Sequence, residues 1–201
     1  MGISLPAGWQ ADPGRPFLSK LPVGVVAGCV LFFAGLAGCR SSVALDPQTP
    51  TVNLTSSSFA AGEIPQKFTC NGPGVSPALD WTAPPPAAAS FALIVDDLDA
   101  PLGLFVHWIV YNLPPSTRKL PEAFPPQSQL ADGTRQGRND FGDTRYGGPC
   151  PPGKSPHRYR FTRYALNSML NLPPGATRSQ VESAIKGHIV ARGQMIARYG
   201  G

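Results

Sequence analysis

Charged residues are scarce in this sequence, and this limits the partners that we expect. Only 14% of the 201 residues are Asp, Glu, Lys or Arg, and the formal net charge is +5. The basic residues are scattered and form no dense cluster, so nucleic-acid binding is not predicted. Histidine and cysteine are also few, and no close pair of them has the spacing of metal ligands, so neither a metal nor a cofactor is predicted.

Long hydrophobic runs are almost absent as well. A single run, over residues 21–37, is long enough to meet a membrane, which excludes a multi-span transporter. The 24 prolines and 22 glycines would interrupt helix bundles and coiled coils. A hydrophobic share of 42% still suffices for a packed core, so one domain with a short tail is predicted.

The first 38 residues have the pattern of an export signal. Arg15 and Lys20 precede the apolar run, which ends in the small residues of Leu36-Ala-Gly-Cys39. This tetrapeptide resembles the lipobox of bacterial lipoproteins, in which cleavage before the cysteine is followed by its lipidation. We therefore predict a signal peptide over 1–38, a lipidated Cys39 with a tether over 39–50, and a domain over 51–201. An ordinary signal peptide and an uncleaved anchor are the alternatives.

On this interpretation the protein is anchored in the cell envelope. Arg40 is not the acidic residue associated with inner-membrane retention, so the periplasmic face of the outer membrane is expected in a Gram-negative cell. Cleavage removes Cys29 and lipidation occupies Cys39, which leaves Cys70 and Cys150. An even pair of cysteines in an oxidising compartment predicts a disulfide, and two free thiols are the alternative.

Short apolar runs separated by Pro, Gly and Asn favour a β-rich domain. We expect strands over 91–96, 105–112 and 159–166. Shorter strands are expected over 52–55, 66–69 and 194–199. The 159–166 segment alternates with period two, so Tyr159, Phe161 and Arg163 should share one face.

One helix is predicted near the C-terminus. Thr177 has Gln180 three residues later, which is a capping-box arrangement. Val181, Ile185 and Ile189 would then form one apolar face, and Gly187 would weaken or end the helix.

Three polar groups of residues adjoin the predicted strands: residues 96–101, His107-Trp108, and residues 146–159. Each has a simple structural explanation, since Asp side chains are common in turns and His107 beside Trp108 suits a core position. A calcium loop is not supported, because Pro101 occupies its fifth position and no glutamate closes it. A thiol nucleophile is not supported either, because Cys150 lies among prolines rather than at a helix N-terminus.

Together these groups resemble the two signatures of the phosphatidylethanolamine-binding protein family. The segment 97–101, Asp-Leu-Asp-Ala-Pro, with His107-Trp108 is similar to the first, although Leu98 stands where proline is usual. The segment 146–153, Tyr-Gly-Gly-Pro-Cys-Pro-Pro-Gly, with His157-Arg-Tyr159 is similar to the second. The bacterial Raf-kinase-inhibitor-like branch is the nearest match, and the likeness runs over about residues 52–199.

This resemblance implies a mainly β fold, an antiparallel β-sandwich with a few short peripheral helices and a small anion pocket. Carried over by motif, the ligand-binding residues would be Asp97, His107, Gly148, His157 and Tyr159. Pro151 and Pro152 would shape the pocket wall, and Asp99 would be a supporting residue behind it.

The chemistry of such a pocket is coherent. Imidazoles titrate near pH 6.5, donate N–H groups, and gain charge beside an anion. The hydroxyl of Tyr159 and a backbone N–H near Gly148 would add neutral donors. Asp97 would orient a histidine, accept a proton from a protonated phosphate, or meet an ammonium group.

The sequence therefore predicts a non-enzymatic binding protein for a phosphate-type small molecule or a phospholipid head group, attached to the membrane by its lipid. One alternative is an envelope hydrolase or lyase that uses Asp97, His107 and His157 for acid–base work, although no activated nucleophile is evident. The other is a protein-interaction module, because the resembled family includes modulators of kinases and proteases. Kinase inhibition itself carries little weight, since an exported protein would not meet cytosolic kinases.

Overall fold

The computed structural model describes residues 49–59, 62–153 and 155–200. The chain divides into two units, Met1–Cys39 and Arg40–Gly201, and every described residue belongs to the second. The predicted signal peptide, Cys39 and most of the tether lie outside the described residues. Within those residues no helix has the length and the hydropathy needed to cross a bilayer.

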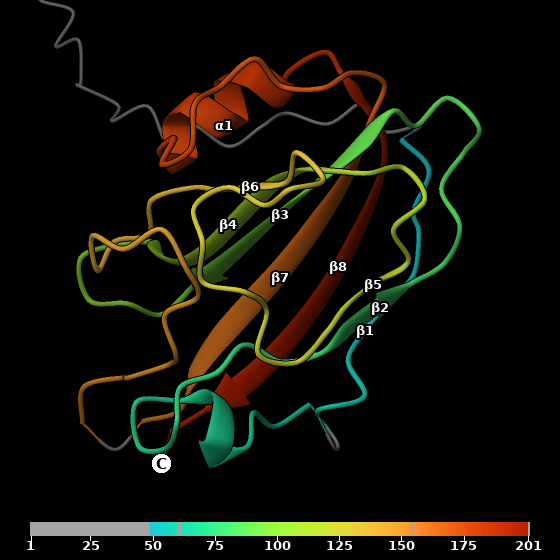
Figure 1. Cartoon of the computed structure of the whole chain (residues 1–201). Helices are drawn as coiled ribbons and strands as arrows, with labels where there is room; N and C mark the ends of the chain where they lie inside the picture. The colour runs from blue at the N-terminus through green and yellow to red at the C-terminus, as the bar shows by residue number, and fades with distance from the viewer. Residues whose placement is uncertain (1–48, 60–61, 154, 201) are drawn as a thin grey trace, which may run out of the picture. The chain divides into compact units, whose positions relative to one another are not determined.

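A five-stranded antiparallel sheet forms the centre of the domain (Figure 1). Its strand order is β6-β4-β3-β7-β8. The two central long strands, β3 (Ser90–Asp97) and β4 (Phe105–Leu113), are buried along almost their whole length. They are flanked by β6 (Arg135–Gln136) on one side and by β7 (His157–Leu166) and β8 (Ile189–Tyr199) on the other. The predicted strands over 91–96, 105–112, 159–166 and 194–199 all lie within these elements.

A smaller antiparallel sheet covers one face of the large one. It consists of β1 (Leu54–Thr55), β2 (Leu79–Trp81) and β5 (Lys119–Leu120), in the order β1-β2-β5. Side chains from both sheets form the main hydrophobic core, among them Trp81, Phe91 and Trp108. The prediction of a mainly β, two-sheet fold is therefore confirmed.

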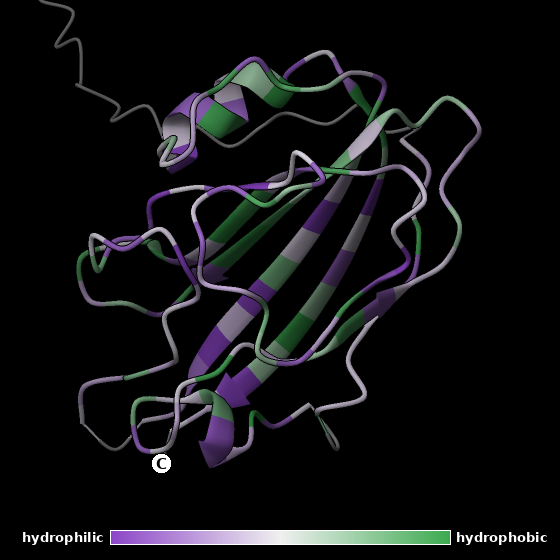
Figure 2. Cartoon of the chain, viewed as in Figure 1, coloured by the Kyte–Doolittle hydropathy of each residue, from purple (hydrophilic) through white to green (hydrophobic). Residues whose placement is uncertain are grey.

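The alternation predicted for β7 is confirmed, and Figure 2 shows it as bands of opposite hydropathy along β7 and β8. Tyr159 and Phe161 lie in the core between the sheets. Arg163 is fully buried on the same face, with its guanidinium 4.7 Å from the ring centre of Phe91 and 5.3 Å from that of Trp81. Burial lowers the pKa of Arg163 to about 10, while the two rings supply cation–π contacts that offset part of that cost.

The other face of the large sheet is covered by α1 (Arg178–Ile185), whose Val181 and Ile185 pack in a second core. The predicted capping box is present, since the Thr177 side chain accepts from the Gln180 N–H and the Gln180 side chain accepts from the Thr177 N–H. The helix ends at Ile185, before Gly187 at φ +81°. Ile189 was expected on the helix, but it begins β8, because the chain reverses at this glycine.

The expected strand over 66–69 is wrong. Residues Gln66–Phe68 form a 3-10 helix, η1, which starts after Pro65 at φ −62°. The N–H groups of Phe68 and Thr69 donate to the carbonyls of Pro65 and Gln66. A proline that fixes a turn conformation and two consecutive turn hydrogen bonds leave no ladder partner for this segment.

Candidate functional site

Asp97, His107 and His157 lie together in one pocket of about 440 Å³, although 60 residues separate the first from the last. The sheet register explains this. Strand β3 is antiparallel to both β4 and β7, so the last residue of β3 lies beside the first residues of its two neighbours. Asp97 is indeed opposite Phe105 of β4 and Tyr159 of β7. We call this cavity the two-histidine pocket.

A β-bulge turns His107 towards this pocket. Val95 pairs with Trp108 and Asp96 pairs with Val106, so His107 is an extra residue without a partner on β3. Trp108 lies in the core between the sheets, whereas Val106 lies in the core under α1. The extra residue puts His107 on the same side as Trp108, and its ring meets that of Tyr159 edge-on at 5.2 Å.

His157 is held by Asp97 at the floor of the pocket. Its Nδ1 lies 2.7 Å from Asp97 Oδ2, and both side chains are more than nine-tenths buried. Asp97 Oδ1 accepts the backbone N–H of Asp99 at 2.9 Å. Because a carboxylate accepts and does not donate, the Nδ1 atom of His157 carries the hydrogen.

His107 is oriented by a backbone carbonyl rather than by a carboxylate. Its Nδ1 lies 2.8 Å from the carbonyl oxygen of Gly147, which only accepts, so this nitrogen also carries the hydrogen. Burial lowers the pKa of His107 below 6.5, and the Gly147 carbonyl and the charge of Asp97 counter this only in part. At neutral pH His107 is therefore a neutral imidazole whose remaining nitrogen, Nε2, is an acceptor.

The polar floor is surrounded by apolar walls. Apart from Asp97 and the two histidines, the lining comes from the β3–β4 loop, from Phe105 and Phe141, and from the 150–152 segment: Ala100, Pro101, Leu102, Gly103, Leu104, Phe105, Phe141, Cys150 and Pro152. The Phe141 ring packs against those of Phe105 and His107 at 4.8 and 5.3 Å. A few convergent polar groups in an apolar cavity are typical of a small-ligand site.

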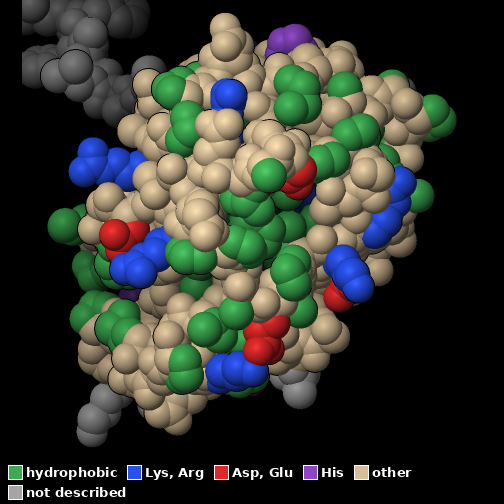
Figure 3. All heavy atoms as spheres, viewed as in Figure 1, with side chains coloured by type: hydrophobic (Ala, Val, Ile, Leu, Met, Phe, Trp, Pro, Cys, Tyr) green, Lys and Arg blue, Asp and Glu red, His purple; other side chains and the backbone are tan. Residues whose placement is uncertain are grey.

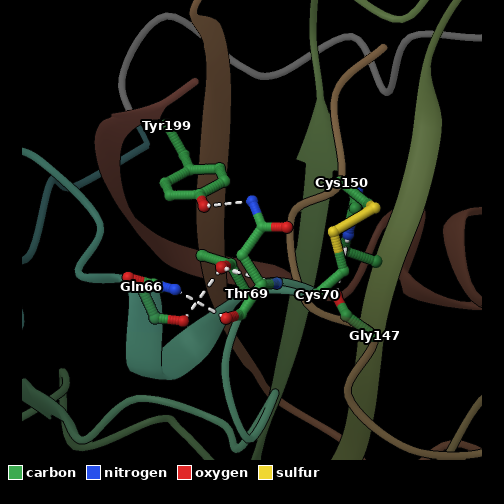
Figure 4. Close-up of a disulfide and its surroundings, with 8 residues drawn as sticks. Gln66, Thr69, Cys70, Gly147, Cys150 and Tyr199 are labelled. Atoms are coloured by element: carbon green, nitrogen blue, oxygen red, sulfur yellow. Dashed lines mark hydrogen bonds between the residues drawn. A yellow bond between two sulfur atoms is a disulfide. The ribbon is translucent and has the colours of Figure 1, made fainter. Parts of the chain in front are cut away.

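Cys150 and Pro152 form one wall of the pocket, and a disulfide fastens their segment, residues 146–152, to the chain beside η1 (Figure 4). The bridge joins Cys70 to Cys150, and the Cys70 N–H also donates to the Pro149 carbonyl at 3.0 Å. The Tyr146 hydroxyl donates to the Phe68 carbonyl at 2.9 Å. The segment that carries the Gly147 carbonyl is thus anchored at several points, and the disulfide expected from the sequence is present.

Comparison with known proteins shows the family of this chain. The sequence profile of a family described as "Phosphatidylethanolamine-binding protein" matches residues 55–200, which is most of the chain. The chain belongs to the phosphatidylethanolamine-binding protein family. A UPF0098 protein of Aquifex aeolicus is 48% identical over 151 residues, 74% of this chain and 88% of that protein. A UPF0098 protein of Methanothermobacter thermautotrophicus is 43% identical over 149 residues, 74% of this chain and 98% of that protein.

Solved structures in the family have the same fold. A putative phosphatidylethanolamine-binding protein homologue from Chlamydia trachomatis superposes with a TM-score of 0.67 at 39% identity, and the match covers 75% of this chain and 98% of that one. YbcL of Escherichia coli, described as a member of the mammalian phosphatidylethanolamine-binding protein family, superposes with a TM-score of 0.68 at 30% identity, with the same coverage. Membership is consistent with a binding protein rather than an enzyme.

Three residues carried over from the family signatures do not line the two-histidine pocket. Tyr159 is fully buried behind His107, and burial followed by the charge of Asp97 raises its pKa. Gly148 lines a separate cavity of about 550 Å³, and a Cβ there would lie 2.7 Å from the Phe68 carbonyl oxygen. Pro151 faces a third cavity, beside Tyr199, whereas Pro152 does line the pocket.

Asp99 does not line the pocket but contacts the start of β7 beside it. Its carboxylate accepts from the Arg158 backbone N–H at 2.8 Å and from the Arg158 guanidinium at 2.6 and 2.9 Å. These bonds hold the pKa of Asp99 at about 2, well below its ordinary value. They fix the β3–β4 loop to the start of β7, so the backbone N–H that Asp99 donates to Asp97 is held in place.

Two contributions to the site escaped the sequence interpretation. The Gly147 carbonyl that orients His107 is a backbone group and has no sequence signal of its own. The aromatic and aliphatic walls, Leu102, Leu104 and Phe141, also were not assigned. In the described part of the chain no group of three His, Cys, Asp or Glu side chains is arranged to hold a metal ion.

Proposed function

We propose that this family member binds a phosphate-type group, either a small phosphorylated molecule or a phospholipid head group, in the two-histidine pocket. The observation that carries the proposal is the common orientation of the imidazoles. Both Nδ1 atoms are engaged, by Gly147 and by Asp97, so each ring keeps Nε2 for a ligand. Both residues line the same cavity.

The ligand must supply a hydrogen when the histidines are neutral. A neutral ring whose Nδ1 donates offers only a lone pair at Nε2. A phosphomonoester monoanion, which keeps one P–O–H group near pH 6, or an ammonium group would match it. The share of a phosphomonoester that keeps this P–O–H group rises as the pH falls towards its second pKa of about 6. Binding should therefore strengthen as the pH falls from 8 to 6.

Calorimetric titration with phosphoethanolamine tests this. We expect measurable heat at pH 6, weaker binding at pH 8, and loss of binding in His157→Ala. His188→Ala is the matched control, because His188 is exposed and bonded to Asn167 away from the pocket. Equal binding by the wild type and His157→Ala, with circular dichroism showing both folded, would remove the pocket assignment.

A second candidate function follows from the Asp97–His157 hydrogen bond. A carboxylate that holds the Nδ1 hydrogen of a histidine is the arrangement used by many general bases. No serine, threonine or lysine is among the described residues of the pocket lining, and Cys150 is committed to the disulfide. Turnover of a phosphomonoester or phosphodiester that Asp97→Asn abolishes would favour this acid–base enzyme over the binding protein.

We also propose that the domain works in the cell envelope, attached through a lipid on Cys39, with a protein partner as a further ligand class. The support is the sequence pattern of residues 15–39. Radiolabelled palmitate should enter the wild-type chain in a bacterial host and should not enter Cys39→Ser. Labelling of both to the same extent would contradict the anchor.

A further inference from the structure

Large hydrophobic side chains gather around the two-histidine pocket. In the described part of the chain five large hydrophobic residues are exposed, and three of them, Leu102, Leu104 and Phe141, line this cavity. Leu102 is fully exposed and the other two are about half exposed. Figure 3 shows hydrophobic side chains at the left edge of this face, where Figure 1 places the β3–β4 loop. A group of this kind around one opening marks an interaction surface, whereas single exposed residues do not.

The β3–β4 loop holds Leu102 away from the domain. The Gly103 N–H donates to the Ala100 carbonyl at 3.0 Å, which closes a turn with Pro101 and Leu102 at its central positions. Proline fixes the backbone at the first of these positions. Residues 101–104 are all exposed, and a Cβ on Gly103 would meet no atom within 4 Å. Leu102 therefore lies at the tip of a projecting, hydrogen-bonded turn.

We propose that this turn, with Leu104 and Phe141 beside it, inserts into the surface of a phospholipid bilayer and brings the pocket to the depth of the head groups. The inference rests on the proposed function, because it makes the bilayer the source from which the pocket takes its ligand. The occupant is the lipid surface, not a free phosphate compound.

The shape of the surface favours lipid over a second protein. A specific protein interface needs a broad complementary surface, of about 1,000 Å² or more. A single leucine that projects from a turn suits a fluid phase that closes around it, as interfacial hydrophobic anchors do.

The charges beside the turn are those that lipid phosphates attract. A groove of about 1,070 Å³ shares Leu102 and Leu104 with the pocket and is lined by Arg138, Arg160 and Arg178, against Asp140 and Glu182. Arg160 and Arg178 pair with Asp96, and Arg178 also pairs with Glu182. Arg138 is exposed and forms no ion pair with any residue of the described ranges. Its guanidinium is available to lipid phosphates at the surface.

The predicted tether is long enough for this orientation. The Arg192 N–H donates to the Pro50 carbonyl, so the chain joins β8 near its start. The pocket lies at the other end of β8, where Tyr199 pairs with His157. Seven strand residues span about 23 Å, whereas the twelve residues of 39–50 reach about 40 Å when extended. A lipid on Cys39 and the turn can therefore contact the same bilayer.

Vesicle flotation tests the proposal with residues 40–201, because the matched region is almost the whole length of the M. thermautotrophicus relative and of both solved chains. The vesicles contain phosphatidylcholine, phosphatidylethanolamine and phosphatidylglycerol in equal parts. We expect Leu102→Ser to lower the partition coefficient about tenfold, because one leucine loses its burial in lipid. Met169→Ser, which changes an exposed residue that does not line the pocket, should leave it unchanged. Equal losses in both variants, or none in either, would overturn the proposal.

A depth measurement gives a second, independent result. A nitroxide on Leu102→Cys should become shielded from a water-soluble nickel relaxation agent when these vesicles are added, and a nitroxide on Met169→Cys should not. The bridged Cys70 and Cys150 do not react with the label. Equal accessibility of the two labels would contradict insertion. Sedimentation that shows Leu102→Ser converting a dimer into a monomer would assign the surface to a second copy of the chain and overturn the proposal of bilayer insertion.

Calorimetry on the unmodified domain separates this inference from the proposed function. Heat from soluble phosphoethanolamine without shielding of position 102 would refute bilayer insertion and leave the pocket assignment standing. Shielding of position 102 without such heat would refute the pocket assignment and support the docking surface.

Discussion

Removal of the Cys70–Cys150 disulfide should lower the free energy of unfolding by about 4 kcal/mol. The bridge closes a loop with a sequence separation of 80 residues, which contains β2 to β6 and therefore about half of the domain. In the chain-entropy treatment, a closed loop of this length is worth about 4.5 kcal/mol at 25 °C, because it restricts the unfolded chain. A domain of this size has about 5–15 kcal/mol in total, so the double variant should fold but with a narrow margin.

The native contacts around the bridge should survive its removal. Neither the hydrogen bond from the Cys70 N–H to the Pro149 carbonyl nor that from the Tyr146 hydroxyl to the Phe68 carbonyl involves sulfur. Both cysteines are exposed, so serine fits at both positions. Urea denaturation of Cys70→Ser/Cys150→Ser, followed by tryptophan fluorescence, measures the effect. The slope of the unfolding free energy against urea concentration should also increase, because the unfolded chain exposes more surface without the crosslink.

Two controls make this prediction specific. Each single serine variant should lose about as much free energy of unfolding as the double variant. The reduced wild type should have the same free energy of unfolding as these variants. A loss below about 1 kcal/mol with an unchanged urea slope would refute the reasoning, since the bridge would then not restrict the unfolded chain.

Three further predictions concern residues around the pocket. Gly148→Ala should lower the free energy of unfolding by about 1–3 kcal/mol, because its Cβ would lie 2.7 Å from the Phe68 carbonyl oxygen; an unchanged melting temperature would contradict this. Asp99→Asn should cost less than about 1 kcal/mol at pH 7, because its pair with Arg158 is partly exposed. Because the pKa of Asp99 is lowered to about 2, the stability that this pair adds is lost as the pH falls from 3.8 through about 2. Urea titrations should therefore show the wild type as more stable than Asp99→Asn at pH 7, and the two proteins as nearly equal at pH 2. The lowered pKa of His107 means that the unfolded state binds more protons just below pH 6.5, so the wild type should lose more stability on acidification from pH 7 to 5 than His107→Gln; parallel melting curves would refute this.

The long elements of the fold were predictable because burial leaves a clear pattern in them. Residues 91–95 are an unbroken apolar run, as expected for a central strand covered on both faces, and β7 alternates with period two. Residues 66–69 lack such a pattern, and there the turn geometry after Pro65 decided the outcome. The strand at Ile189 follows from the reversal at Gly187, a residue that the sequence analysis expected to weaken or end the helix.

The candidate site was predictable where side chains carry it and not where the backbone does. The signatures identified Asp97, His107 and His157, and the antiparallel register brings them together. The bulge that turns His107 inward has no sequence signature, and neither has the Gly147 carbonyl that fixes its tautomer. Tyr159 was assigned to the ligand from the resemblance, and the structure places its side chain with Phe161 in the core between the sheets.

Nitrogen NMR of the histidine rings tests the central claim most directly. The chain has three histidines, and long-range proton–nitrogen spectra report Nδ1 and Nε2 of each ring separately. Addition of phosphoethanolamine at pH 6 should move the Nε2 signals of His107 and His157, while both Nδ1 atoms stay protonated and the His188 signals stay in place. Unchanged Nε2 signals at both pocket histidines, at a ligand concentration that saturates the calorimetric signal, would contradict the account.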